Sequence, residues 1–171
     1  MTATLRPLTL EDLHRVLELE TALFGAGAWS EWMLREEIEG PYRHYLALTV
    51  RETAAPAIAL DPSTGPSQAP ERELLVGYGG TWFDGRDAQI MTIGIAPTHQ
   101  GRGYGRILLD ALLAHERERG AEQVFLEVRI DNELAIGMYE RAGFEQLGRR
   151  RGYYQPENVD ALTMRLALRR D

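Results

Sequence analysis

The sequence of 171 residues contains no cysteine. This absence excludes disulfides, zinc sites with cysteine ligands and a covalent cysteinyl intermediate. Long apolar runs are also missing, since none approaches the ~18 residues that a membrane span needs. The segment from Met1 to Leu8 has neither the basic region nor the apolar region of a secretory signal. We therefore expect a cytoplasmic protein with no membrane partner.

An excess of positive charge is missing as well, because the formal net charge is −7. Proteins that coat nucleic acid are usually basic, so we expect no nucleic-acid partner. The four histidines are scattered without the spacing of metal ligands, and we expect no metal site. No Gly-Lys pair occurs, which excludes the phosphate-binding loop of nucleoside triphosphatases.

The length and composition predict a single domain over residues 1–171. Hydrophobic residues make up 44% of the chain and charged residues 26%, which is ordinary for a globular protein. Residues 52–72 stand apart, because they hold four of the eight prolines together with serine, threonine and glycine. We interpret this segment as a long surface loop inserted into the domain.

Hydrophobic periodicity and turn residues predict interspersed strands and helices along the rest of the chain. Ser30 and Asn132 are expected to cap short helices, and Asp84-Gly85 is expected to form the turn of a β-hairpin. Hairpins dominate the order, so we expect a mixed α+β fold with helices on both faces of a sheet. The predicted strands are 5–8, 42–50, 74–83, 88–95, 124–128, 144–150 and 161–168, and the predicted helices are 10–23, 31–39, 103–119 and 133–142.

The segment Gln100-Gly101-Arg102-Gly103-Tyr104-Gly105 places three glycines at alternate positions before a leucine-rich helical pattern. The first N–H groups of a helix have no partner within it, and the helix dipole favours negative charge there. The turn therefore predicts an anion site. A dinucleotide-binding fingerprint would need a glycine at position 106, which is Arg106 here.

The spacing Gln-x-x-Gly-x-Gly, between a hairpin and a long helix, resembles the coenzyme A pyrophosphate loop of the GNAT superfamily of N-acetyltransferases. Leu5 to Leu13 is similar to the opening strand and helix of that superfamily, and Ile93 to Pro97 is similar to its fourth strand. Asn132-x-x-Ala135-x-x-x-Tyr139-x-x-x-Gly143-Phe144 is similar to its late motif. The resemblance implies the GNAT fold, with a central, mostly antiparallel sheet of about seven strands.

One subfamily, the RimI-like ribosomal-protein-alanine N-acetyltransferases, fits better than the others. The similar stretches are Phe125 to Arg129, Asp131-Asn132 and Arg149 to Tyr154, with Trp29-Ser30-Glu31 upstream. Gly25-Ala26-Gly27-Ala28 precedes Trp29 here, where the subfamily commonly has Phe-Pro-Trp-Ser. The resemblance implies direct transfer of acetyl, in a ternary complex, to the N-terminal alanine of a small-subunit ribosomal protein.

Acetyl-CoA is the co-substrate that the resemblance implies. Backbone N–H groups of the Ile93–Ile95 strand would meet the oxyanion, and the guanidinium groups of Arg102 and Arg106 suit pyrophosphate. The alternative for these arginines is a solvated helix start, and for Asn132 a simple helix cap. The expected cofactor-binding residues are Ile93, Gly94, Ile95, Gln100, Gly101, Arg102, Gly103, Tyr104, Gly105, Arg106 and Asn132.

Glu127 is the candidate general base, because it is a carboxylate within a strand otherwise suited to burial. The alternative is a strand residue that reaches solvent or pairs with Arg129. Tyr139 is the candidate general acid for the leaving thiolate, since it lies about two helical turns after Asn132. The alternative for Tyr139 is a core residue with its hydroxyl at the edge. The resemblance favours the catalytic role for both.

The basic and aromatic run Arg149 to Tyr154 is interpreted as a loop that grips the acceptor. The expected acceptor-binding residues are Trp29, Glu31, Arg151, Tyr153 and Tyr154. Other functions stay open, namely acetylation of lysine or a small amine, and a non-catalytic module that binds acyl-CoA. A monomer is expected, with a protein N-terminus as its partner.

Overall fold

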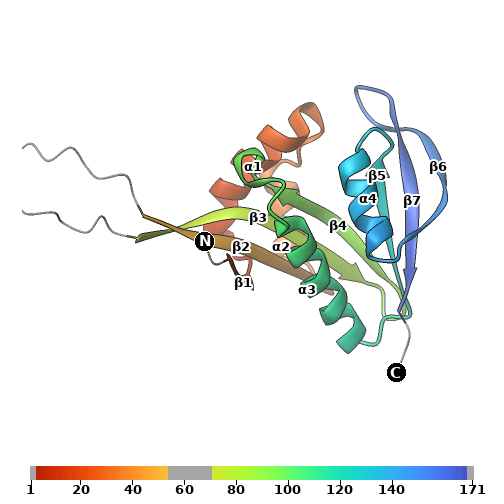
Figure 1. The fold of residues 1–171 in the computed structure, drawn as a ribbon, viewed down its shortest axis with the longest axis horizontal. Coiled ribbons are helices and arrows are strands. Elements are labelled where there is room, and N and C mark those ends of the chain that lie inside the picture. Colours follow the sequence, from red (N-terminus) through yellow and green to blue (C-terminus); the bar gives the residue numbers. More distant parts are fainter. Residues whose placement is uncertain (1–2, 54–70, 169–171) are drawn as a thin grey trace, which may run out of the picture.

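The structure is a computed structural model that describes residues 3–53 and 71–168. A seven-stranded sheet forms its centre, with the strand order β1-β2-β3-β4-β5-β7-β6 (Figure 1). All neighbouring strands are antiparallel except β4 and β5, which confirms the predicted mixed, mostly antiparallel sheet. The strands are β1 (Ala3–Pro7), β2 (Arg43–Thr53), β3 (Glu71–Phe83), β4 (Ala88–Ile95), β5 (Gln123–Arg129), β6 (Glu145–Tyr154) and β7 (Val159–Ala167).

Helices cover both faces of the sheet, as predicted. On one face, a Cβ added at Gly94 would lie within 3 Å of Leu23, which belongs to α1 (Leu13–Phe24). On the other face, a Cβ at Gly79 would contact Leu112 of α3 (Tyr104–Glu118). The remaining helices are α2 (Glu31–Glu39) and α4 (Glu133–Arg141), and α4 lies beside the β5–β7 part of the sheet (Figure 1). Within the described ranges, no helix is long and apolar enough to cross a membrane.

The predicted helix caps are confirmed. The side chain of Ser30 accepts a hydrogen bond from the N–H of Met33 at 3.3 Å, and that of Asn132 accepts one from the N–H of Ala135 at 3.1 Å. The first helix begins three residues later than predicted, because Leu10–Asp12 forms a 3-10 turn before it. These caps fix where α2 and α4 start, and α4 starts at the cavity described below.

The prediction that residues 52–72 form a loop is wrong at both ends of the segment. Glu52 pairs with Arg72 and Thr53 with Glu71, so β2 and β3 continue into the segment as an antiparallel ladder. Backbone pairing with a neighbouring strand extends these strands beyond the apolar pattern. The central part of the predicted insertion, 54–70, lies outside the described residues.

The predicted loop Arg149–Tyr154 is also wrong, because these residues belong to β6. Arg150 pairs with Ala161, and Tyr154 pairs with Val159, so the pairing of β6 and β7 continues to the end of the run. The turn that joins the two strands comes after Tyr154. Successive side chains of a strand point to opposite faces of the sheet, so only alternate residues of this run can point to the same face.

The parallel pair β4 and β5 is short and then opens. Among the described residues, its paired positions are Ala88 with Val124 and Gln89 with Phe125. Beyond them the strands diverge, which Figure 1 shows as a V that is closed at its lower end. Met91 is the extra residue of a β-bulge, because Ile90 and Thr92 pair with consecutive residues of β3. The bulge lies where the two strands part.

Candidate active site

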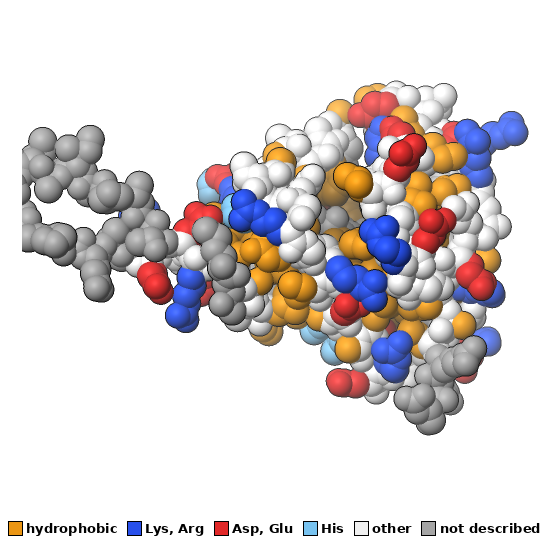
Figure 2. Space-filling view, viewed as in Figure 1, with side chains coloured by type: hydrophobic (Ala, Val, Ile, Leu, Met, Phe, Trp, Pro, Cys, Tyr) orange, Lys and Arg blue, Asp and Glu red, His pale blue; other side chains and the backbone are white. Residues whose placement is uncertain are grey.

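A cavity of about 480 Å³ fills the opening between β4 and β5. Its walls come from the end of α1 and the segment after it, from β4 and β5, from the start of α4, and from the β6–β7 turn. Figure 2 shows the surface hollowed near the middle of the face in view. A Cβ added at Gly27 would lie 4.0 Å from the carbonyl oxygen of Gln155, so the segment after α1 approaches the β6–β7 turn at the rim.

The cavity brings together six of the residues that the sequence predicted for the site. They come from separate segments of the chain and include both catalytic candidates. These residues are Trp29, Ile93, Glu127, Asn132, Tyr139 and Tyr154.

Other predicted site residues do not line this cavity. Glu31 lies in the first turn of α2 and pairs with Arg35 at 3.4 Å. Tyr153 is 42% exposed, and the guanidinium of Arg150 lies 4.4 Å from its ring centroid. Arg151 is exposed on β6. Their roles in acceptor binding stay predictions.

The glycine turn forms the start of α3, away from the cavity walls. Gly101 and Gly103 have φ values of 74° and 80°, a conformation that side chains other than glycine rarely adopt. No hydrogen bond within the described ranges uses the N–H groups of residues 101–105. Unpaired N–H groups at a helix start can hold a phosphate, so the turn fits the pyrophosphate of coenzyme A.

The side chains around this turn already have protein partners. Arg102 donates to the carbonyl of Thr98 at 3.2 Å, and Arg106 donates to Asp110 at 2.7 Å. Tyr104 is buried, with its ring beside that of His99. Anion binding at the turn would therefore rely mainly on the backbone, and phosphate contacts of the two arginines stay predictions.

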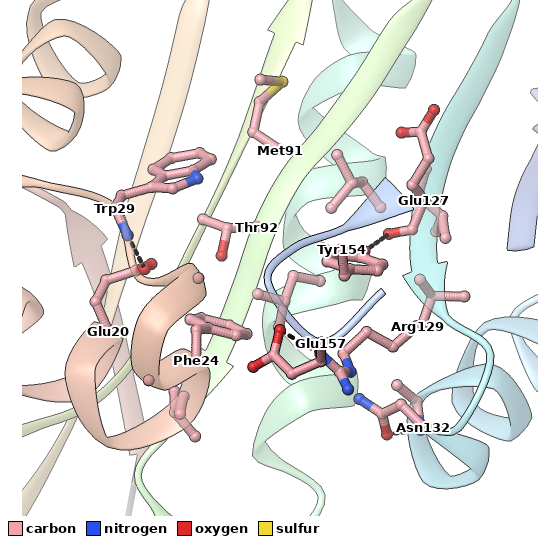
Figure 3. A pocket seen from close by; sticks show the side chains of 18 of the residues that line it. Glu20, Phe24, Trp29, Met91, Thr92, Glu127, Arg129, Asn132, Tyr154 and Glu157 are labelled. Carbon is pink, nitrogen blue, oxygen red and sulfur yellow. Dashed lines mark hydrogen bonds and ion pairs between the residues drawn. The ribbon is translucent and has the colours of Figure 1, made fainter. Parts of the chain in front are cut away.

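The carboxylate of Glu127 is held by two donors. Arg150 donates to its Oε1 at 3.1 Å and Gln89 donates to its Oε2 at 2.9 Å. The side chain of Glu127 is 15% exposed. Its sequence alternative, a pair with Arg129, is not what the structure forms, since Arg129 pairs with Asp131 at 3.0 Å. Glu127 therefore has a fixed orientation on β5, on the sheet face opposite Leu126 (Figure 3).

Tyr139 approaches the cavity from α4 and packs edge to face on Phe144. Burial raises the pKa of its phenol well above the ordinary value. No hydrogen bond of its hydroxyl is formed within residues 3–53 and 71–168. A phenol held in its neutral form keeps a proton that it can donate to a departing thiolate.

Tyr154 links the β6 strand to Glu127, because its hydroxyl donates to the carbonyl oxygen of Glu127 at 3.3 Å (Figure 3). Burial, with smaller effects of Tyr153 and Glu127, raises the pKa of Tyr154 to about 12. The guanidinium of Arg129 lies 5.6 Å from the Tyr154 ring centroid and also faces Glu157. Arg129 and Glu157 line the cavity, and sequence reasoning missed both.

Glu20 is a third residue that sequence reasoning missed. It lines the cavity although only 2% of it is exposed. Burial raises the pKa of Glu20, and its hydrogen bonds to Tyr78 and Trp29 oppose this shift. A signal existed, because Glu20 follows Val16 by four residues and so lies on the apolar stripe of the first helix.

Comparison with known proteins decides the family. The model of the acetyltransferase (GNAT) family matches residues 16–144. The chain belongs to this family. The predicted fold, family and enzyme class are therefore confirmed, and the chain is a GNAT acetyltransferase.

Relatives of this GNAT chain match over most of their length. The chain is 36% identical to the N-alpha-acetyltransferase RimI of Mycobacterium tuberculosis, over 95% of this chain and 90% of the relative. It is 31% identical to a Bacillus subtilis protein named as a ribosomal protein bS18-alanine N-acetyltransferase, over 95% and 93% of the two chains. The crystal structure of the ribosomal-protein-S18-alanine N-acetyltransferase of Escherichia coli superposes with a TM-score of 0.75 at 26% identity, over 97% of this chain and 94% of that one.

A further solved structure shares the fold and was determined with acetyl-CoA bound. Arabidopsis thaliana NAA60 in complex with acetyl-CoA superposes with a TM-score of 0.76 at 18% identity, over 98% of this chain and 99% of that one. In the part of the present chain that the structure describes, no group of three or more acidic or histidine side chains could hold a metal ion.

Proposed function

We propose that this GNAT enzyme transfers the acetyl group of acetyl-CoA to the α-amino group of a protein N-terminus. The N-terminal alanine of a small-subunit ribosomal protein is the acceptor that we favour, because the names of the Bacillus subtilis relative and of the Escherichia coli structure state that substrate. The proposal includes a cytoplasmic, monomeric enzyme that meets its acceptor as a free protein N-terminus.

One observation carries the proposal. Glu127 and Tyr139 reach the same cavity from opposite faces of the sheet. Tyr139 lies on the face that α3 covers, where the glycine turn offers unpaired N–H groups to a pyrophosphate. Glu127 lies on the face where the segment after α1 and the β6–β7 turn form the rim. A donor from one face and an acceptor from the other would meet between β4 and β5.

The chemistry needs a neutral amine, a stabilised oxyanion and a proton for the leaving thiolate. An α-amino group has a pKa of about 7.7–8.0, so a useful fraction is neutral near pH 7 and a modest base is sufficient. Glu127 would accept the proton that the amine loses when its nitrogen bonds to the thioester carbon. As the carbon–sulfur bond breaks, Tyr139 would donate a proton to the sulfur.

The backbone of β4 would stabilise the oxyanion. Beyond Gln89, no residue in the described part of the chain pairs with this strand on the β5 side, so its polar backbone groups there are available to a ligand. Preorganised N–H donors are often the largest single contribution to acyl transfer. The predicted donors in Ile93–Ile95 lie on this part of the strand.

A peptide panel tests the proposal. The enzyme is incubated with acetyl-CoA and peptides that begin with Ala-Arg or with other N-terminal residues, and release of free thiol is followed. Peptides with a blocked N-terminus and an internal lysine, and a polyamine, are the controls. We expect turnover only with free N-termini. Turnover of the lysine peptide or the polyamine alone would replace the proposal, and tight cofactor binding without turnover of any amine would indicate a non-catalytic module.

The enzyme itself cannot contribute acetyl-lysine to this assay. All 19 of its basic residues are arginine, so it contains no lysine. Any acetyl-lysine that mass spectrometry detects after the reaction must therefore come from the added peptide.

A further inference from the structure

Glu20 is a buried carboxylate that the proposed chemistry does not use. It lies near the end of α1 and faces the cavity from the side opposite Glu127 (Figure 3). A buried carboxylate is costly unless donors satisfy it, and an apolar side chain of similar size is often at least as stabilising. Stability alone therefore does not explain a carboxylate at this place in the core.

Both oxygens of Glu20 have a donor. The backbone N–H of Trp29 donates to Oε2 at 2.9 Å, and the hydroxyl of Tyr78 donates to Oε1. Tyr78 is fully buried on β3, and a Cβ added at Gly94 of β4 would lie 2.8 Å from its ring. The carboxylate thus connects the segment that contains Trp29 to the sheet beside β4.

The segment between Glu20 and Trp29 is held by backbone hydrogen bonds, from Gly25 to Thr21 and from Ala28 to Gly25, and at its ends by packing of Leu23 and Trp29 against the core. Residues 25–28 are Gly-Ala-Gly-Ala, so no side chain there is larger than a methyl group. Phe24, just before them, is 38% exposed. Side chains of residues 25–28 add little, so the hydrogen bond from the Trp29 N–H to Glu20 is the polar contact that fixes the backbone of Trp29 against the cavity.

We propose that Glu20 is a positioning residue for the acceptor, because its carboxylate fixes Trp29 and with it the cavity wall that the first residue of the acceptor contacts. This inference rests on the proposed function. Glu20 itself takes no part in the transfer of a proton or of the acetyl group.

The test compares Glu20→Leu and Glu20→Gln with Glu18→Leu and Glu18→Gln. Glu18 is the matched control, since it lies on the same helix with its side chain 49% exposed. In Glu20→Leu we expect the KM for the acceptor peptide to rise about tenfold, as loss of a hydrogen bond to a charged group implies, with the KM for acetyl-CoA changed by less than about twofold. Glu20→Gln should recover most of this loss, because its amide oxygen can accept from Trp29 while Tyr78 reverses its hydroxyl.

Hydrogen exchange gives a second readout that does not depend on activity. The amide of Trp29 should exchange faster in Glu20→Leu, whereas the amide of Leu34, which donates to the carbonyl of Ser30 in α2, should not change. If Glu20→Leu fails to fold, Tyr78→Phe replaces it, because this variant removes the donor that ties the Glu20 carboxylate to β3 and should also raise the KM for the peptide, while Glu20→Gln stays the near-wild-type control.

Three results would overturn the inference. An unchanged peptide KM with faster Trp29 exchange would make Glu20 a structural anchor only, and an equal rise of both KM values would indicate a general disturbance. A wild-type enzyme that acetylates no N-terminal peptide would overturn the proposed function, and the acceptor role of Glu20 with it, whatever the exchange of Trp29.

Discussion

Arg150 donates a hydrogen bond to Glu127 at 3.1 Å although the two residues lie on strands that are not neighbours. β7 separates β5 from β6, and the arginine side chain spans it. Gln89 binds the other carboxylate oxygen from β4. The candidate base is therefore oriented by groups from both sides of β5 before any acceptor arrives.

Glu127→Gln should lower kcat by about 100- to 1,000-fold, because the amide cannot accept a proton from the amine. The KM for acetyl-CoA should stay within about twofold, since Glu127 lies on the acceptor face. Stability should change little, because the Arg150 side chain is 55% exposed and water replaces the lost partner. Steady-state kinetics and thermal unfolding check this.

Glu145→Gln is the control for that prediction. Glu145 lies on β6, is 73% exposed at its side chain and pairs with Arg165 at 3.4 Å. Glu145→Gln removes the same charge at a residue that does not line the cavity, so its rate should equal that of the wild type. A normal rate in Glu127→Gln would remove Glu127 as the base.

Tyr139→Phe should lower kcat by about 100-fold and leave stability within about 0.5 kcal/mol of the wild type. Activity should fall while stability stays nearly unchanged, because the hydroxyl has no hydrogen bond within the described ranges and the ring keeps its packing on Phe144. Tyr42→Phe, at a residue that is 69% exposed, is the matched control. Equal rates for the two variants would contradict the role of Tyr139 as acid.

The pH profile gives a sharper check of the same residue. A phenol is protonated below its pKa, and burial raises the pKa of Tyr139 well above its ordinary value. We therefore expect no loss of kcat from deprotonation of Tyr139 up to about pH 10, the ordinary pKa of a tyrosine. A fall in kcat near neutral pH that disappears in Tyr139→Phe would contradict this protonation state.

Local signals in the sequence predict much of this fold. Ser30, Asn132 and the Asp84-Gly85 turn act within a few residues of themselves, and the structure bears out each of them. The ends of β2 and β3 were not predictable in this way, because Thr53 is a strand residue only through its pairing with Glu71. Pairing between strands depends on the whole sheet and not on the local pattern.

The candidate site shows the same limit. Glu127 was recognisable as a carboxylate in an apolar strand, but its partner was not. The order of the strands brings Arg150 to Glu127, whereas Arg129 pairs with Asp131 instead. Glu20 was missed although its helical position indicates burial, because a single sequence does not say which donors will meet a buried carboxylate. The local sequence does not determine which residues will contact each other in the folded chain.

Gly103→Val should weaken coenzyme A binding by about 100-fold or more, because a branched side chain would block the approach of a phosphate to the N–H groups of the turn. It should also cost about 1–2 kcal/mol of stability, since φ is 80° at this position. Calorimetric titration with coenzyme A measures the first effect and thermal unfolding the second.

Gly85→Val separates these effects. Gly85 has a φ of 103° and, like Gly103, nothing within 4 Å of an added Cβ, but it lies in the β3–β4 turn. The two variants should therefore lose similar stability, and only Gly103→Val should lose affinity. Equal affinity for coenzyme A in both would show that the glycine turn does not bind the cofactor.

His44 makes the stability of the fold depend on pH. The rings of His44 and His115 stack with centroids 3.5 Å apart, beside Arg119. Burial, with His115 and Arg119, lowers the pKa of His44 from 6.5 to about 4. His44 therefore binds a proton near pH 6.5 in the unfolded chain but only near pH 4 in the folded protein. Stability from this group is present above pH 6.5 and is lost as the pH falls toward 4.

The loss should be about 1–2 kcal/mol, less than the full shift implies, because His44 is only partly buried and solvent screens its charge. Urea unfolding at pH 7.5 and pH 4.5 measures it, and His44→Asn should flatten the difference. His14→Asn is the control, since the His14 side chain is 90% exposed and its removal should leave the pH dependence as in the wild type. A wild-type protein that is equally stable at both pH values, with His44→Asn unchanged, would show that the stacked pair carries no proton linkage.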